Sequence, residues 1–244
     1  MLSNEELGAF LEGAQVAPEV FELRGDYRAM LIAAEGMVPG AGDQVSEALL
    51  RAAEAAAREA LRAGTPEELA HVAAWREAYR AFGAKPQRTR NSLEALLRRC
   101  ETGLPRVNRL TDIYNAVSLL HQVPVGGEDL RRYAGPPRLV RAAGNETFDT
   151  VAGGETVVEH PDPGEVVWRD EAGVTCRRWN WRQAHRTRLR EDTTTAFFVI
   201  DALGPISDQA LRDAGDALIG LVSALGPEVR VAHRIIANTT EQGE

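Results

Sequence analysis

One short stretch of the sequence carries the side chains best suited to chemistry. Asn115 falls inside a predicted amphipathic helix, where asparagine is unfavourable because its amide competes with the backbone and needs a partner. Gly126 and Gly127 follow that helix, and glycine permits close approach to backbone N–H groups. Glu128 and Asp129 come next and can receive a cationic group. An amide, backbone donors and carboxylates this close together indicate a site that orients a polar ligand.

The same residues have structural explanations as well. Asp112 can be the N-cap of the helix predicted over residues 113–122. Asn115 can tie that helix to a neighbouring loop, and the glycine pair after it can simply end the helix. Both interpretations stay open at this point.

A second polar segment runs through Arg-Arg-Trp-Asn-Trp-Arg, residues 177–182. On a strand the side chains alternate, which would place Arg178, Asn180 and Arg182 on one face and the two tryptophans on the other. Core tryptophans backed by solvated arginines are one explanation. Indoles beside guanidiniums also suit stacking on bases and contact with phosphates, so a nucleic-acid site is the other.

The overall charge argues against a protein that coats nucleic acid. The 28 basic residues are outnumbered by 36 acidic ones, for a net charge of -8, and general affinity for phosphates would need the opposite balance. We expect no DNA partner. The basic residues are nevertheless clustered, in two groups formed by Arg88, Arg90, Arg98, Arg99 and Arg106, and by Arg177, Arg178, Arg182, Arg186, Arg188 and Arg190.

Neither a metal nor another cofactor is predicted. His71, His121, His160 and His233 are scattered without the spacing of metal ligands, and only His185, among arginines, is a candidate proton carrier. The two cysteines are far apart in sequence, and no stretch approaches the roughly 20 apolar residues of a membrane span. The first residues do not resemble a signal peptide, so we expect a cytoplasmic protein without a membrane partner.

The helices and strands that must position these residues are predicted to form one α+β domain over residues 1–244. Helices fall mainly in the first half, and a mixed, mostly antiparallel β-structure follows in the second. Helices are predicted over residues 43–63, 65–82, 91–100, 113–122 and 207–225. Strands are predicted over residues 16–23, 28–33, 138–142, 155–159, 165–169, 174–178, 195–201 and 229–236.

The polar segments also resemble a known family. Residues 106–120 and 124–129 are similar to the pattern R-x-x-N-x-x-x-D-x-x-N-Y-V-M-L and G-Q-P-L-H-A-F-D of the editing module in the phenylalanyl-tRNA synthetase beta chain. Residues 141–148, which include Glu146, resemble that module's R-x-A-x-x-G-E, and residues 176–183 and 193–198 resemble its closing strands. Matching positions are Asn108, Asp112, Asn115, Val117, Leu119, Pro124 and Asp129.

The resemblance implies a domain that binds the acceptor end of tRNA and hydrolyses a wrongly attached amino acid. Such chemistry needs an oriented water, donors for the oxyanion and groups that bind the ammonium. We expect Asn115, Gly126 and Gly127 to be the catalytic residues of such a site. The expected substrate-binding residues are Asn108, Asp112, Tyr114, Glu128, Asp129, Glu146, Trp179, Asn180 and Asp201. The two basic clusters predict that Arg106, Arg178, Arg182 and Arg186 bind RNA.

Several positions depart from the family pattern. The family's editing histidine falls on Gly126, and the threonine before the helix asparagine falls on Tyr114. The glutamate that reads a tyrosine hydroxyl falls on Val199, with Asp201 as a stand-in. Small residues that widen the family's pocket fall near Trp179 and Asn180. The pocket is therefore expected to differ in shape and specificity.

Three functions follow from these observations. The first is a deacylase that acts in trans on a mischarged aminoacyl-tRNA. The second is a module that binds tRNA or an amino acid and has lost hydrolysis together with the histidine. The third is a hydrolase or binder of a small amino-acid metabolite. The amino acid, the tRNA and the oligomeric state are not determined by the sequence.

Overall fold

The computed structural model describes residues 2–238 and has the predicted α+β fold. Its central element is a four-stranded antiparallel sheet in the order β11-β2-β10-β3. The four strands are β2 (Arg28–Glu35), β3 (Val125–Asp129), β10 (Thr195–Ala202) and β11 (Arg230–Ala237). The two middle strands alternate between two cores, which explains why their sequences read as continuous apolar runs rather than as alternating ones.

A second sheet has the order β1-β4-β7-β8-β9, with β1 parallel to β4 and the other pairs antiparallel. Its strands are β1 (Gln15–Val16), β4 (Arg138–Arg141), β7 (Val166–Arg169), β8 (Val174–Arg177) and β9 (Arg182–Gln183). A separate hairpin consists of β5 (Phe148–Ala152) and β6 (Glu155–Glu159). The first strand of that hairpin was not predicted.

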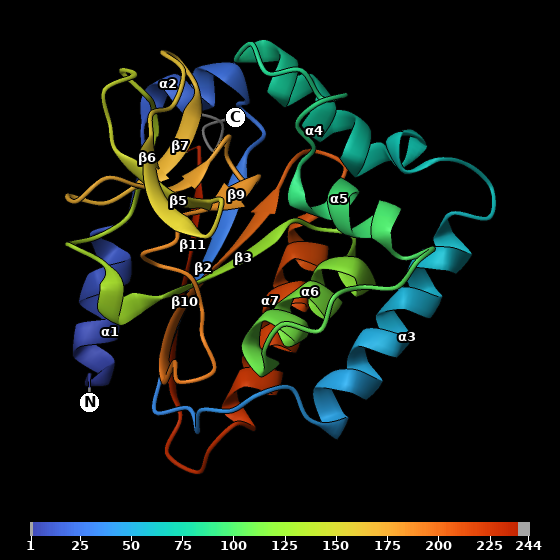
Figure 1. Ribbon diagram of the computed structural model, residues 1–244, viewed down its shortest axis with the longest axis vertical. Coiled ribbons are helices and arrows are strands. Elements are labelled where there is room, and N and C mark those ends of the chain that lie inside the picture. The colour runs from blue at the N-terminus through green and yellow to red at the C-terminus, as the bar shows by residue number, and fades with distance from the viewer. Residues whose placement is uncertain (1, 239–244) are drawn as a thin grey trace.

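The helices surround the central sheet on both faces. They are α1 (Asn4–Glu12), α2 (Pro18–Leu23), α3 (Gln44–Ala60), α4 (Ala70–Ala81), α5 (Ser92–Arg99), α6 (Arg109–His121) and α7 (Asp208–Ser223), with short 3₁₀ turns η1 (Pro66–Glu68) and η2 (Leu130–Arg132). Figure 1 shows α3, α5, α6 and α7 gathered on one side and the second sheet with its hairpin on the other. Within residues 2–238, no helix is long and apolar enough to cross a membrane.

Two cores flank the central sheet because side chains alternate along each strand. Leu31 and Phe197 point toward the second sheet, α1 and α4. Ile32 and Phe198 point toward α6 and α7. A third, smaller core joins α3, α5 and α6. The sheet therefore fixes α6 relative to the second sheet, and the functional residues lie between them.

Helix α6 begins earlier than the sequence indicated. Asn108, not Asp112, is the N-cap: its Oδ1 accepts a hydrogen bond from the Thr111 N–H at 2.9 Å. Asp112 lies in the first turn, where its carboxylate accepts from the Val107 N–H at 3.0 Å. Both side chains thus satisfy backbone groups at the start of the helix.

Two segments adopt a different structure from the predicted one. Residues 16–23 were expected to form a strand, but Pro18 starts the helix α2, because proline suits the first helical position. The predicted turn at Gly126 and Gly127 is part of strand β3, where the two residues pair with Val199 and Phe198. Pairing with a fully buried strand decides the conformation of the glycines here.

The predicted strand over residues 174–178 ends at Arg177, so the expected alternation through Arg182 does not occur. Arg178 and Trp179 have φ values of 47° and 67°, in the left-handed region, and they turn the chain back toward β9. Trp179 is consequently fully buried against Trp75 and Tyr27. The aromatic core here holds a turn that the sequence pattern did not indicate.

The substitution Gly127→Ala should destabilise the fold, because the added Cβ would lie 2.8 Å from Phe198 and 2.9 Å from Leu189 in the α6–α7 core. We expect a loss of about 1–3 kcal/mol in the free energy of unfolding, measured by urea denaturation. Gly8→Ala in α1 is the matched control: no atom lies within 4 Å of its added Cβ, and an alanine there should stabilise the helix by up to about 1 kcal/mol. Equal stability of Gly127→Ala and the wild type would contradict this packing.

Candidate functional site

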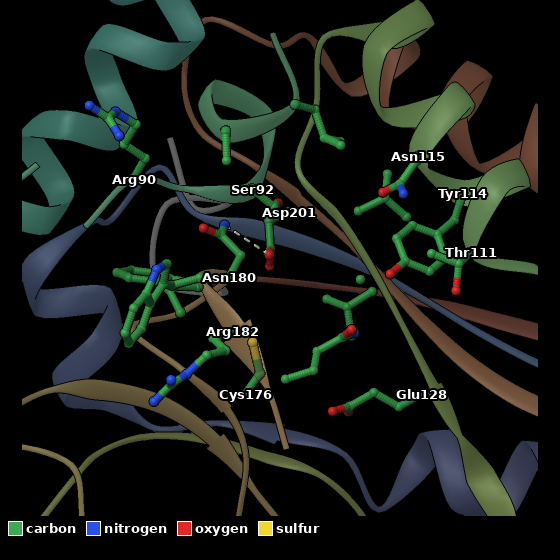
Figure 2. Close-up of a pocket in the computed structure, with 18 of the residues that line it drawn as sticks. Arg90, Ser92, Thr111, Tyr114, Asn115, Glu128, Cys176, Asn180, Arg182 and Asp201 are labelled. Carbon is green, nitrogen blue, oxygen red and sulfur yellow. Dashed lines mark hydrogen bonds between the residues drawn. The ribbon is translucent and has the colours of Figure 1, made fainter. Parts of the chain in front are cut away.

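A cavity of about 610 Å³ lies where α5, α6, β3, β10 and the turn between β8 and β9 meet. The predicted site residues Tyr114, Asn115, Gly126, Glu128, Trp179, Asn180, Arg182 and Asp201 line it. Figure 2 shows Thr111, Tyr114 and Asn115 on one side, across from Asn180, Arg182 and Asp201. Segments separated by more than 60 residues in the sequence thus share one hollow.

Helix α6 presents the side chains of Thr111, Tyr114 and Asn115 to the cavity. Burial raises the pKa of the Tyr114 phenol, so it stays protonated. The Asn115 amide is partly exposed and has no hydrogen-bond partner among residues 2–238. The alternative in which Asn115 ties α6 to a loop therefore has no support in the structure. Its amide is free to bind a ligand in the cavity.

A buried hydrogen-bond network lies at the end of β10. Asp201 is 2% exposed, and its carboxylate accepts from Tyr27 Oη at 2.6 Å and from Asn180 Nδ2 at 3.1 Å. Tyr79 Oη donates to Asn180 Oδ1 at 2.9 Å, which fixes the orientation of that amide. Burial raises the pKa of Asp201 to about 7 against the opposing effect of the two donors. Asp201 is thus a carboxylate that titrates near neutrality.

Glu128 on β3 is the second buried carboxylate of the cavity. It accepts hydrogen bonds from the Tyr133 hydroxyl and, at 3.0 Å, from Thr187 Oγ1. Burial raises its pKa to about 7, although these hydroxyl donors oppose the shift. Proton transfer at neutral pH is favoured by groups with such a pKa.

The antiparallel ladder between β3 and β10 decides which glycine N–H group bonds to β10. The Asp201 N–H donates to the Pro124 carbonyl at 3.0 Å, and two positions along the ladder Gly126 pairs with Val199. Hydrogen-bonded and non-hydrogen-bonded pairs alternate along such a ladder. Gly126 therefore exchanges hydrogen bonds with Val199, whereas the N–H of Gly127 points away from β10. The N–H of Gly127 points instead toward the other edge of β3, where Glu128 forms an antiparallel bridge with Arg188.

The cavity is lined by more arginines than carboxylates. Arg88 and Arg99 are exposed, and their guanidiniums have no hydrogen-bond or ion-pair partner within residues 2–238. The other arginines here are Arg90, Arg98 and Arg182. Among the described residues, buried polar atoms of the lining without a partner include Ser92 Oγ, Trp168 Nε1 and Arg182 Nε, while Arg90 Nε has only an ion pair with Glu94 at 3.6 Å. Buried polar atoms are normally paired, so these donors indicate a ligand or ordered water that the lining is built to hold.

Five predicted catalytic or substrate residues lie outside the lining. Asn108 and Asp112 serve the start of α6, and Asp112 borders a separate hollow of about 230 Å³. Gly127 faces the α6–α7 core. Asp129 accepts from the Arg131 N–H and Thr193, and Glu146 accepts from two N–H groups of its own loop. Each of these four polar side chains has a structural partner.

Three of the four arginines predicted to bind RNA are held in ion pairs away from the cavity. Arg106 pairs with Glu47 and Glu54, Arg178 with Glu165 and Asp162, and Arg186 with Asp170. Arg182 alone of the four lines the cavity. The Trp181 ring at the cavity already carries the guanidiniums of Arg178 and Arg182, each 4.7 Å from its centroid, and Trp179 is buried. These contacts leave little aromatic surface for base stacking.

Lining residues that our site prediction left out include Arg88, Arg90, Arg98 and Arg99, together with Ser92, Thr111 and Gln183. The four arginines belong to the basic cluster around α5, which the sequence analysis identified but did not assign to the site. Gln183 donates to the Gly127 carbonyl at 2.8 Å. His185, the candidate proton carrier, does not line the cavity. Residues 2–238 contain no cluster of three or more His, Cys, Asp or Glu placed to hold a metal ion.

Every residue that lines the cavity falls within residues 74–214, which match the profile of the B3/4 domain. That segment is more than half of the chain. The chain belongs to the B3/4 domain family. This finding confirms the resemblance drawn from the sequence.

Among solved structures, the B3/4-family chain is similar to an N-terminal fragment of the phenylalanyl-tRNA synthetase beta-subunit from Pyrococcus horikoshii. The identity is 12% and the TM-score is 0.45. The similarity covers 89% of this chain and 49% of the fragment, so the chain spans about half the length of that structure. No curated protein matches the chain.

Asp201→Asn should flatten the pH dependence of stability. Burial raises the pKa of Asp201 from 3.8 to about 7, so the folded state binds an extra proton between these values. The free energy of unfolding therefore falls as pH rises across this window. The asparagine variant cannot titrate, so it should lack the part of this fall that Asp201 causes. Urea denaturation at pH 5, 6, 7 and 8 measures it. Asp216→Asn on the exposed face of α7 is the control for the substitution itself. An identical slope in the Asp201 variant and the wild type would contradict the raised pKa.

Proposed function

We propose that this chain acts in trans on an aminoacyl-tRNA in the cytoplasm, where it binds the acceptor end and hydrolyses the ester of a mischarged amino acid. Membership of the B3/4 domain family supports a role related to tRNA synthetases. A cavity of about 610 Å³ falls in the range of roughly 300–1,000 Å³ that is usual for small-molecule sites. It can therefore accept an aminoacyl group with part of the terminal nucleotide.

The observation that carries the proposal is the free Asn115 amide, which faces the buried carboxyl–amide network of Asp201 and Asn180 across the cavity. Ester hydrolysis needs a group that orients the water or the carbonyl, and no covalent nucleophile is obligatory. Burial raises the pKa of the Cys176 thiol well above its usual range, so this side chain is a poor nucleophile. Asn115 therefore orients the ester and the attacking water.

The arginines around α5 supply the contacts to phosphate. Arg88 and Arg99 have exposed, unengaged guanidiniums at the cavity within the described part of the chain. A local positive surface of this kind attracts an RNA end even on an acidic protein. These two residues replace Arg106, Arg178 and Arg186 in the proposal, since those three are engaged in ion pairs.

A binding module without hydrolysis is the second candidate. It is favoured by one observation: among residues 2–238, the lining of the cavity includes no histidine. Such a module would use the same arginines and the same free amide to hold the acceptor end. The two candidates differ in whether the ester is cleaved.

The first test is a deacylation panel over mischarged tRNAs with Asn115→Ala. Loss of a preorganised donor commonly costs a hundredfold or more in rate, so we expect kcat to fall on the order of 10²-fold while tRNA affinity stays nearly constant. Asn145→Ala on an exposed loop is the matched control. Undiminished deacylation by a folded Asn115→Ala protein would refute its role. If the wild type cleaves none of the esters, the binding module is favoured.

The second test measures binding of aminoacylated tRNA as a function of salt. Binding should weaken steeply between about 50 and 200 mM salt, because phosphate contacts release counterions. The double variant Arg88→Ala, Arg99→Ala should bind more weakly and with a salt slope reduced by about two. Arg212→Ala on the exposed face of α7 is the control. Absent binding, or binding that does not depend on salt, would favour instead a protein that acts on or binds a small amino-acid metabolite.

A further inference from the structure

Strand β3 presents a single ionisable side chain to the cavity. Residues 126 and 128 are two positions apart and therefore share one face of the strand, and both line the cavity. A Cβ added to Gly127 would meet Phe198 and Leu189, which lie in the opposite core. The register of β3 on β10 thus turns Glu128 toward the cavity (Figure 2).

The Glu128 carboxylate is held without a compensating cation. Its oxygens accept from Tyr133 and Thr187, whereas no arginine, lysine or histidine of residues 2–238 forms an ion pair with it. The buried Glu94, by contrast, is paired with Arg76, and a buried charge without such a pair is costly. An ionised carboxylate has about four acceptor sites, so two remain for a ligand or a water.

The hydrogen-bond donors distinguish Glu128 from Asp201. A hydroxyl can donate or accept, so Tyr133 and Thr187 can satisfy Glu128 whether it is ionised or protonated. Asp201 has one hydroxyl partner, Tyr27, but its other partner is the Asn180 amide nitrogen, which only donates and is fixed by Tyr79. A group that gains and releases a proton in each turnover needs adaptable partners. Both partners of Glu128 are of this kind, whereas only one of the two partners of Asp201 is.

From this geometry, and resting on the proposed function, we infer that Glu128 is the proton acceptor that activates the hydrolytic water. Glu128 takes a proton from the water as its oxygen forms a bond to the ester carbonyl carbon. The bond between that carbon and the ribose oxygen then breaks, and the ribose oxygen receives the proton from Glu128. The products are the free amino acid and the tRNA, and no other reactant is needed. Asn115 orients the ester in this reaction.

The pH dependence expected for Glu128 follows from its surroundings. Burial raises its pKa to about 7, and hydroxyl donors and the charge of Arg186 oppose the shift. Burial also raises the pKa values of the neighbouring phenols and thiol, which keeps them neutral in this range. The titratable and charged groups that face Glu128 are Tyr114, Tyr133, Cys176, Arg186 and Arg188. Activity should therefore rise with pH through about 7 as Glu128 ionises.

The decisive experiment compares deacylation by the wild type, Glu128→Gln and Tyr133→Phe over pH 5.5–9. Glu128→Gln should lower kcat by about 10²–10⁴-fold and abolish the rise near pH 7, with KM nearly unchanged. Tyr133→Phe keeps the carboxylate but removes a hydrogen bond that favours its ionised form, so the rise should move to higher pH. Asp201→Asn should keep the rise near pH 7. Glu155→Gln on the exposed β5–β6 hairpin is the matched control.

A folded Glu128→Gln protein with the wild-type rate and pH profile would overturn the inference while leaving the proposed function standing. A pH profile of Tyr133→Phe identical to that of the wild type would also overturn the inference. This variant provides the test even if Glu128→Gln does not fold. If Asp201→Asn loses the increase in activity near pH 7, that increase reports the ionisation of Asp201 and not of Glu128. If the wild type cleaves no ester in the panel, both the inference and the proposed hydrolysis fall.

Discussion

The complete burial of β10 is the constraint on which the rest of the structure depends. All eight of its residues are buried, and β2 and β3 occupy both of its edges. Its side chains must therefore alternate between two cores, with Phe197 and Val199 on the cavity side and Phe198 on the other. A polar residue on such a strand has to find its partners inside the protein, and Asp201 finds Tyr27 and Asn180.

That burial has an electrostatic consequence. Asp201 on β10 and Glu128 on β3 lie on the cavity-facing side of the same sheet, away from water and without a paired cation in the described chain. Desolvation disfavours the charged form of each, and the few hydrogen bonds to hydroxyls and an amide only partly compensate for it. The scaffold thus places two carboxyl groups that titrate near neutrality beside a free amide. Such groups are uncommon away from functional sites.

The distribution of arginines shows why net charge was a poor guide to partners. Much of the positive charge is neutralised locally, as in the pairs of Arg106 with Glu47 and of Arg177 with the buried Glu165. Within the described part of the chain, the guanidiniums that remain unengaged at the cavity are those of Arg88 and Arg99, around α5. A ligand at the mouth of the cavity meets this local field rather than the charge of -8 on the whole chain.

The sequence by itself determined the features that depend on neighbouring residues. It determined the α+β class, the amphipathic helices with their caps, such as α5 behind Asn91, and the polar segments that meet at the cavity. The tertiary structure decided the rest. Pairing with β10 made a strand of the predicted glycine turn, and the aromatic core around Trp179 turned the chain where alternation had been expected. Contacts between residues distant in sequence decided which arginines form ion pairs and which line the cavity. Charge interactions depend on distance in space, and local sequence spacing does not encode that distance.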